Sequence, residues 1–153
     1  MTDISRPLTQ GEKDLALSVF AAAIDYAPVR IHRRKWFPLQ PRHVVMAPRG
    51  NIHFHPRGDL WSEDFSAETL WRRALFIHEM THVWQSQHRG RTYLVLMRHP
   101  FCRYDYVLKP GWPLKRYGIE QQAEIVKHAF LLREGATVPG APPLDQYESV
   151  LPF

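Results

Sequence analysis

The sequence predicts a single α+β domain in which three long helices are combined with a small sheet, either antiparallel or mixed. Its 153 residues are a typical length for one domain. Hydrophobic residues make up 44% of the chain, which is enough for a core and excludes a wholly disordered protein. Segments with apolar residues at helical spacing alternate with short strand-type runs that prolines separate. We therefore expect residues 1–153 to form one domain with a proline-rich C-terminal tail over residues 138–153.

The N-terminal part predicts one helix followed by the sheet. Thr9 and Glu12 form a capping-box pattern at the start of a helix over residues 10–25, and Pro28 follows its end. Three runs have strand-type composition, and a tight turn is expected between the second and the third. These runs cover residues 29–32, 44–47 and 51–55.

The remaining two thirds of the chain predict helices. The longest helix is expected over residues 67–88, which contain neither glycine nor proline, with Ser66 as its N-cap and Gly90 at its end. A further long helix and two short ones follow, and these are expected over residues 119–133, 92–97 and 145–150.

Composition and charge exclude several classes of protein. No apolar run is long enough to cross a membrane, and the polar N-terminus lacks a signal-peptide pattern. We therefore expect a cytoplasmic protein without a membrane partner, although export by a dedicated secretion machine would leave the same sequence. One cysteine excludes an internal disulfide framework. The net charge is 20 − 15 = +5, and residues 27–58 hold seven Lys or Arg and no acid. This basic segment could recruit an acidic partner or be an ordinary surface; without a nucleic-acid motif, we do not expect nucleic acid as a partner.

Residues 78–82 read His-Glu-Met-Thr-His inside the longest predicted helix. Residues four apart on an α-helix differ by only ~40° around its axis, so His78 and His82 project from one face. Two neutral histidines in this arrangement can hold one zinc ion. Glu79 then lies where it can take a proton from a zinc-bound water, whose pKa the ion lowers toward ~7. The motif therefore predicts a zinc site with Glu79 as the general base.

A catalytic zinc site usually has a third protein ligand, and two candidates follow the motif. His88 lies at a spacing close to that of metzincins, but an unbroken helix would carry it ~240° round the axis and ~9 Å beyond His82. Glu120 and Glu124 share one face of a later helix. One of them could bind zinc, while the other accepts the second ring N–H of a ligand histidine. Their spacing alone leaves open which of the two plays which part.

The segments HEMTHVWQ, at residues 78–85, and EQQAE, at residues 120–124, together resemble the gluzincin metallopeptidases. These enzymes carry HExxH on one helix and an ExxAE-type ligand segment on a later one. Residues 76–85 are also similar to small bacterial peptidase domains found with toxins and injection machinery, some of them related to the Vgr spike proteins of type VI secretion. Residues 50–54 resemble the edge strand that precedes the active-site helix in zincins.

The resemblance implies a minimal zincin-like fold and zinc-dependent hydrolysis of peptide bonds in a peptide or protein substrate. It assigns His78, His82 and Glu120 as the zinc ligands, and it assigns Glu124 as the acceptor of a hydrogen bond from a ligand histidine. Gluzincins often add a Tyr or His that stabilises the oxyanion. The nearby candidates are Tyr104, Tyr106 and Tyr117, of which we favour Tyr117.

A second hypothesis is a protein that binds zinc but acts as an adaptor or assembly module in a phage-tail-like or secretion apparatus. Its contact surface could be the basic segment together with Tyr147 and Phe153 in the tail. Glu79 would then be dispensable.

Three further histidines are weaker candidates for a metal site. His53 and His55 share one face of a predicted strand and could form a metal pair, although such histidines more often lie on a partly exposed sheet face. His128 lies four residues after Glu124 on the same helix face, where it could support the site or lie at the surface.

Overall fold

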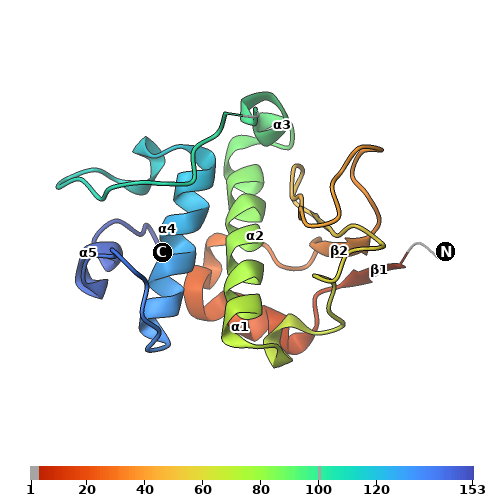
Figure 1. Ribbon diagram of the computed structural model, residues 1–153, viewed down its shortest axis with the longest axis horizontal. Coiled ribbons are helices and arrows are strands. Elements are labelled where there is room, and N and C mark those ends of the chain that lie inside the picture. The colour runs from red at the N-terminus through yellow and green to blue at the C-terminus, as the bar shows by residue number, and fades with distance from the viewer. Residues whose placement is uncertain (1–3, 100) are drawn as a thin grey trace.

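The computed structural model describes residues 4–99 and 101–153, and it confirms the α+β class (Figure 1). The strands are β1 (Ile4–Pro7), β2 (Arg30–Arg33) and β3 (Ile52–His53). The helices are α1 (Gln10–Phe20), α2 (Leu70–Arg89), α3 (Tyr93–Met97), α4 (Ile119–Arg133) and α5 (Leu144–Glu148). Short 3₁₀ turns, η1, η2 and η3, cover Ala21–Ala23, Phe65–Ala67 and Leu114–Arg116. Among the described residues, no helix is long and apolar enough to span a bilayer.

The sheet is mixed and has the order β1-β2-β3. Strand β1 runs antiparallel to β2, whereas β3 runs parallel to β2 with Ile52 opposite Ile31. The sequence did not predict β1, because two of its four residues are polar, one is a proline, and its pairing depends on a partner far along the chain. The strand predicted over residues 44–47 is wrong in extent: it is reduced to one bridge, in which Met46 and His53 exchange backbone hydrogen bonds of 2.7 and 3.1 Å.

The start of the longest helix also differs from the prediction. Ser66 is not its N-cap, because residues 65–67 form the separate turn η2, capped by the side chain of Asp64. Phe65 is fully buried there, and the chain turns once more before α2 begins at Leu70. The capping box of Thr9 and Glu12 is present, Gly90 ends α2, and α4 has the predicted bounds. The helix predicted over residues 10–25 is shorter than expected: α1 ends at Phe20, because Ala21 adopts a positive φ of 48° and the turn η1 follows.

Helices α2 and α4 lie side by side at the centre of the molecule (Figure 1). The fully buried Ala123 lies in the part of α4 that carries the candidate glutamates. The C-terminal residues fold back onto α4 through α5, with Tyr147 only 1% exposed and the ring of Phe153 against Phe20 and Trp84. Tyr147 is therefore a core residue, which contradicts the idea that it belongs to an external contact surface.

The histidine at the end of β3 provides a test of this packing. His53 stacks on His32 with ring centroids 4.6 Å apart, and burial together with this neighbour lowers the pKa of His53 to about 4. Because the folded-state pKa lies below the unfolded value of ~6.5, His53 costs no stability above pH 6.5 and progressively more as the pH falls toward 4. We expect the free energy of unfolding to drop by up to about 3 kcal/mol more in the wild type than in His53→Phe over this range.

Urea unfolding at several pH values measures this difference. His88→Phe is the control, because His88 is exposed at the end of α2. Equal pH profiles for the wild type and His53→Phe would show that His53 titrates normally in the folded protein.

Candidate metal centre

The two histidines of the HExxH motif lie on one face of α2, as their spacing predicts. Their ring centroids are 5.0 Å apart, and both side chains are buried. Glu120 reaches them from the first turn of α4, where its Oε2 lies 3.2 Å from Nε2 of His78 and 3.2 Å from Nε2 of His82. The packing of α2 on α4 thus brings together three side chains that are separated by up to 42 residues.

This cluster could hold a metal ion. The three potential ligand atoms all lie within 4.8 Å of one another, and all three residues are buried. Ligand atoms about 2.0–2.1 Å from a tetrahedral zinc ion are separated by roughly 3.3 Å, close to the 3.2 Å between each imidazole nitrogen and the carboxylate oxygen. Two imidazoles and one carboxylate also form a donor set that suits zinc.

Each candidate histidine is oriented by a contact at Nδ1, the ring nitrogen that does not face the cluster. Oε1 of Glu124 lies 3.1 Å from Nδ1 of His78. Oε1 of Gln85 lies 2.8 Å from Nδ1 of His82, while the amide nitrogen of Gln85 donates to Gln122 and to the backbone of α4. These contacts favour a proton on Nδ1 and leave Nε2 of each ring directed at the cluster.

Gln85 was missed as a site residue by sequence reasoning, where it appeared only as the last residue of the HEMTHVWQ segment. Its position three residues after His82 on the same helix was the available signal.

The imidazoles and carboxylates of the cluster shift one another's pKa values strongly. Although burial opposes the charged form, hydrogen bonds with Glu120 and Glu124 raise the pKa of His78 to about 9. Burial also opposes ionisation of Glu120, but its hydrogen bonds with His78 and His82 hold its pKa well below the usual range. The site thus stabilises positive charge between the carboxylates, which is the property that a cation site needs.

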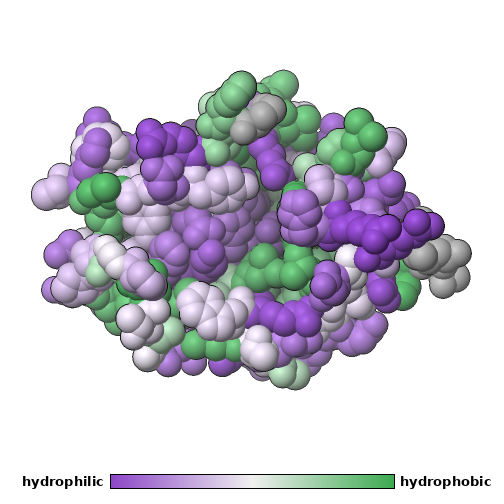
Figure 2. Space-filling view, viewed as in Figure 1, coloured by the Kyte–Doolittle hydropathy of each residue, from purple (hydrophilic) through white to green (hydrophobic). Residues whose placement is uncertain are grey.

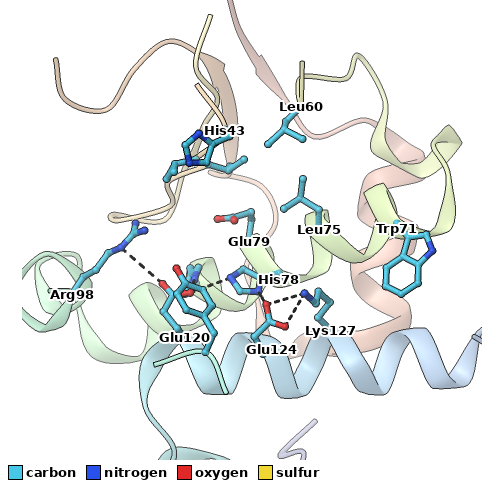
Figure 3. Close-up of a pocket in the computed structure, with 14 residues that line it drawn as sticks. His43, Leu60, Trp71, Leu75, His78, Glu79, Arg98, Glu120, Glu124 and Lys127 are labelled. Carbon is cyan, nitrogen blue, oxygen red and sulfur yellow. Dashed lines mark hydrogen bonds and ion pairs between the residues drawn. The ribbon is translucent and has the colours of Figure 1, made fainter. Parts of the chain in front are cut away.

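Glu79 projects into the cavity beside this cluster (Figure 3). Its side chain is buried, and Oε2 has no hydrogen-bond partner among the described residues. Burial raises the pKa of Glu79 above its usual value. A buried carboxylate without a partner costs stability, so its presence at this position favours a role in chemistry.

The cavity has a volume of about 280 Å³ and two kinds of wall. Apolar side chains, including Leu60, Trp71 and Leu75, line one side (Figure 3). Polar side chains line the rest of the cavity, and among these Arg98 lies 4.0 Å from Oε1 of Glu120 and Lys127 lies 2.7 Å from Oε2 of Glu124.

The space-filling view shows hydrophobic side chains gathered over the nearby helix α3, where Leu96 is largely exposed (Figure 2).

The structure does not bring every sequence candidate to this cavity. His88 is exposed on the continuous helix α2 and donates to the carbonyl of Trp84, so the metzincin-like alternative is wrong. Tyr117 lies in the core, where its hydroxyl accepts a hydrogen bond from the backbone N–H of Lys109. Tyr104 lines the cavity instead, with its ring nearly parallel to that of His78.

The other histidine candidates lie elsewhere. His53 and His55 do not form a pair: His53 is stacked in the core, and Nδ1 of His55 accepts from the backbone N–H of Arg57. His128 does reach the site indirectly, because its Nε2 lies 3.3 Å from Oε2 of Glu124.

Comparison with known proteins finds a related domain in a secreted bacterial spike. No family model matches the chain. The type VI secretion system spike protein VgrG2b of Pseudomonas aeruginosa is 44% identical over 138 residues, which cover 84% of this chain and 13% of the spike protein. The solved effector domain of P. aeruginosa VgrG2b superposes with a TM-score of 0.75 at 39% identity, covering 94% of this chain and 80% of that structure.

Proposed function

The chain belongs to the family of the VgrG2b effector domain, and on this premise we propose that it is a zinc-dependent peptidase that forms one domain over residues 1–153. The observation that carries the proposal is the buried cluster of His78, His82 and Glu120 beside the carboxylate of Glu79, whose Oε2 has no hydrogen-bond partner in the described part of the chain. An effector acts on a target, and this arrangement is suited to hydrolysis.

In this proposal the side chains of the cavity have separate tasks. His78, His82 and Glu120 hold the ion, while Glu124 and Gln85 keep the two imidazoles in the binding tautomer. Zinc, when bound, would activate a water molecule and polarise the carbonyl of the substrate.

The proton transfers and the developing charge are handled by the chain's own groups. Oε2 of Glu79 takes the proton of the attacking water and passes it to the leaving amine, for which its raised pKa is suited. Tyr104 and Arg98 face the same cavity and supply donors for the oxyanion. Tyr104 thus takes the part for which the sequence favoured Tyr117.

An extended peptide can be held at the edge of the cavity by backbone hydrogen bonds. Met46 exchanges both of its backbone bonds with His53, so the N–H and C=O of the preceding residue, Val45, point away from β3. Val45 lines the cavity. Among the described residues no backbone hydrogen bond of Val45 is found, and this edge beside the Met46–His53 bridge supports a peptide or protein as the substrate.

The relationship to a spike protein suggests how the domain reaches its target. The chain spans about 13% of the length of the VgrG2b spike protein, so the properties of that whole protein do not transfer directly. We propose that the domain is an effector delivered by a type VI secretion apparatus, with a protein of that apparatus as its partner.

Metal analysis is the first test of this function. We expect protein purified without a histidine tag to contain about one zinc per chain, with zinc at a thousandfold excess over Kd stabilising the fold by about 4 kcal/mol. Atomic emission spectroscopy and thermal unfolding with and without a chelator measure both quantities. A metal-free native protein that takes up no zinc on titration would exclude the proposed chemistry.

A further inference from the structure

A series of hydrogen bonds and close polar contacts leads from the candidate ligand His78 to the C-terminal helix α5. Glu124 contacts Nδ1 of His78 through Oε1, at 3.1 Å, and Nε2 of His128 through Oε2, at 3.3 Å. Nδ1 of His128 lies 2.5 Å from the hydroxyl of Tyr106, which in turn lies 2.6 Å from the hydroxyl of Tyr147. The series therefore joins α2, α4, the loop before η3 and α5.

The donors and acceptors available fix the direction of every bond in this series. An ionised Glu124 can only accept, so a neutral His128 donates to it from Nε2 and is an acceptor at Nδ1. The hydroxyl of Tyr106 must then donate to Nδ1 of His128. Its oxygen is left to accept from the hydroxyl of Tyr147. All bonds thus run in one direction, from the C-terminal helix toward Glu124.

The electrostatic surroundings support these protonation states. Burial lowers the pKa of His128 and raises that of Tyr106 far above its usual value, which keeps the imidazole neutral and the phenol protonated. Nζ of Lys127 lies 2.8 and 2.7 Å from the two oxygens of Glu124 and gives that carboxylate a cationic partner. The neutral His128 and the protonated Tyr106 are the protonation states that this order of donors and acceptors requires.

We propose that Tyr106, His128 and Tyr147 are positioning residues of the metal site, which hold Glu124 against His78. Lys127 contacts both oxygens of Glu124, at 2.8 and 2.7 Å, but it is a flexible point charge that favours no orientation of the carboxylate. The donor at Nε2 of His128 has a direction fixed by Tyr106, so it determines which oxygen of Glu124 is left for His78. The proposal rests on the proposed function only in that it takes His78 to be a metal ligand.

The test combines a proton signal with metal affinity in the full chain. Tyr106→Phe removes the donor to His128 but keeps the ring. We expect the Nδ1–H proton signal of His78 to shift in NMR spectra of the metal-free protein, and the zinc Kd to rise about tenfold, at the lower end of the range for groups that support a metal ligand. Tyr26→Phe is the matched control, because the hydroxyl of Tyr26 donates to the carbonyl of Ala21, away from the metal cluster; neither quantity should change.

Two substitutions of His128 separate positioning from simple packing. A glutamine can donate to Glu124 from its amide nitrogen and accept from Tyr106 at its oxygen, whereas a leucine can do neither. We expect His128→Gln to keep the zinc Kd within about threefold of the wild type and His128→Leu to raise it about tenfold. A pure packing role would give the two variants the same affinity.

The outcomes also distinguish this inference from the proposed function. Long-range ¹H–¹⁵N spectra should show wild-type His128 with its proton on Nε2; a proton on Nδ1 would overturn the bond order. Wild-type zinc affinity in both Tyr106→Phe and His128→Leu would overturn the positioning role. A wild-type chain that binds no zinc would refute the proposed function, while the His78 signal of the metal-free variants would still decide whether Tyr106 acts on His78.

Discussion

Replacing Glu79 by glutamine is expected to reduce kcat by about 10²–10⁴-fold, the range for removal of a general base. The amide keeps the size of the side chain but cannot accept the proton from water. Because Oε2 of Glu79 is buried and has no hydrogen-bond partner among residues 4–99 and 101–153, the substitution removes a desolvated charge. The melting temperature should therefore stay the same or rise, and zinc should remain bound.

Hydrolysis of a peptide library, followed by mass spectrometry, measures the loss of activity. Glu134→Gln is the matched control, because Glu134 is exposed at the end of α4. The same variant tests the adaptor hypothesis in the bacterial host. If Glu79→Gln retains full biological activity there, the domain binds zinc for its structure and its role is assembly.

The second large effect is expected at Glu120. Glu120→Gln replaces the charged oxygen that lies 3.2 Å from both imidazoles with a neutral one, so we expect the zinc Kd to rise more than 100-fold. Glu124→Gln should raise the Kd by about 10–100-fold, because Glu124 acts on the ion only through His78. His88→Ala should leave it unchanged, since His88 lies at the exposed end of α2.

Competition with a chromophoric chelator gives all three dissociation constants. A larger loss for Glu124→Gln than for Glu120→Gln would mean that the two glutamates exchange roles when zinc binds. Loss of zinc in His88→Ala alone would require α2 to break after Gln85. Either result would leave the HExxH histidines in place and change only the third ligand.

Local sequence patterns were sufficient to predict the helices and most of the candidate cluster. The spacing of His78 and His82, and the position of Glu120 at the start of a periodic segment, depend on the geometry of one helix at a time. Only the packing of α2 on α4 decides between His88 and Glu120, and the continuous α2 places His88 away from the cluster.

Features set by contacts between distant segments could not be predicted in this way. Strand β1 forms because β2 pairs with it, and residues 44–47 lose their ladder because Val44 turns back to bond Pro41. Tyr104 faces the cavity, whereas the hydroxyl of Tyr117 bonds to the backbone of Lys109. The course of the irregular loop before η3 decides this difference, and a hydrophobic periodicity in the sequence cannot predict the course of a loop. The sequence supplied three tyrosines near the site, and tertiary structure selected among them.

The contacts at Nδ1 of the two imidazoles can order the cluster as the protein folds, before any ion is bound. In zinc-finger peptides the ligands become ordered only when the ion binds, so the protein folds and takes up metal in one event. Here Gln85 and Glu124 order His82 and His78 within the packed helices, and a proton near the carboxylates stands in for the cation. Under the proposed function, we expect the chain to fold in a compartment that is poor in free zinc and to acquire the ion after transfer to another. Its activity would then be set by where it arrives rather than by where it is made.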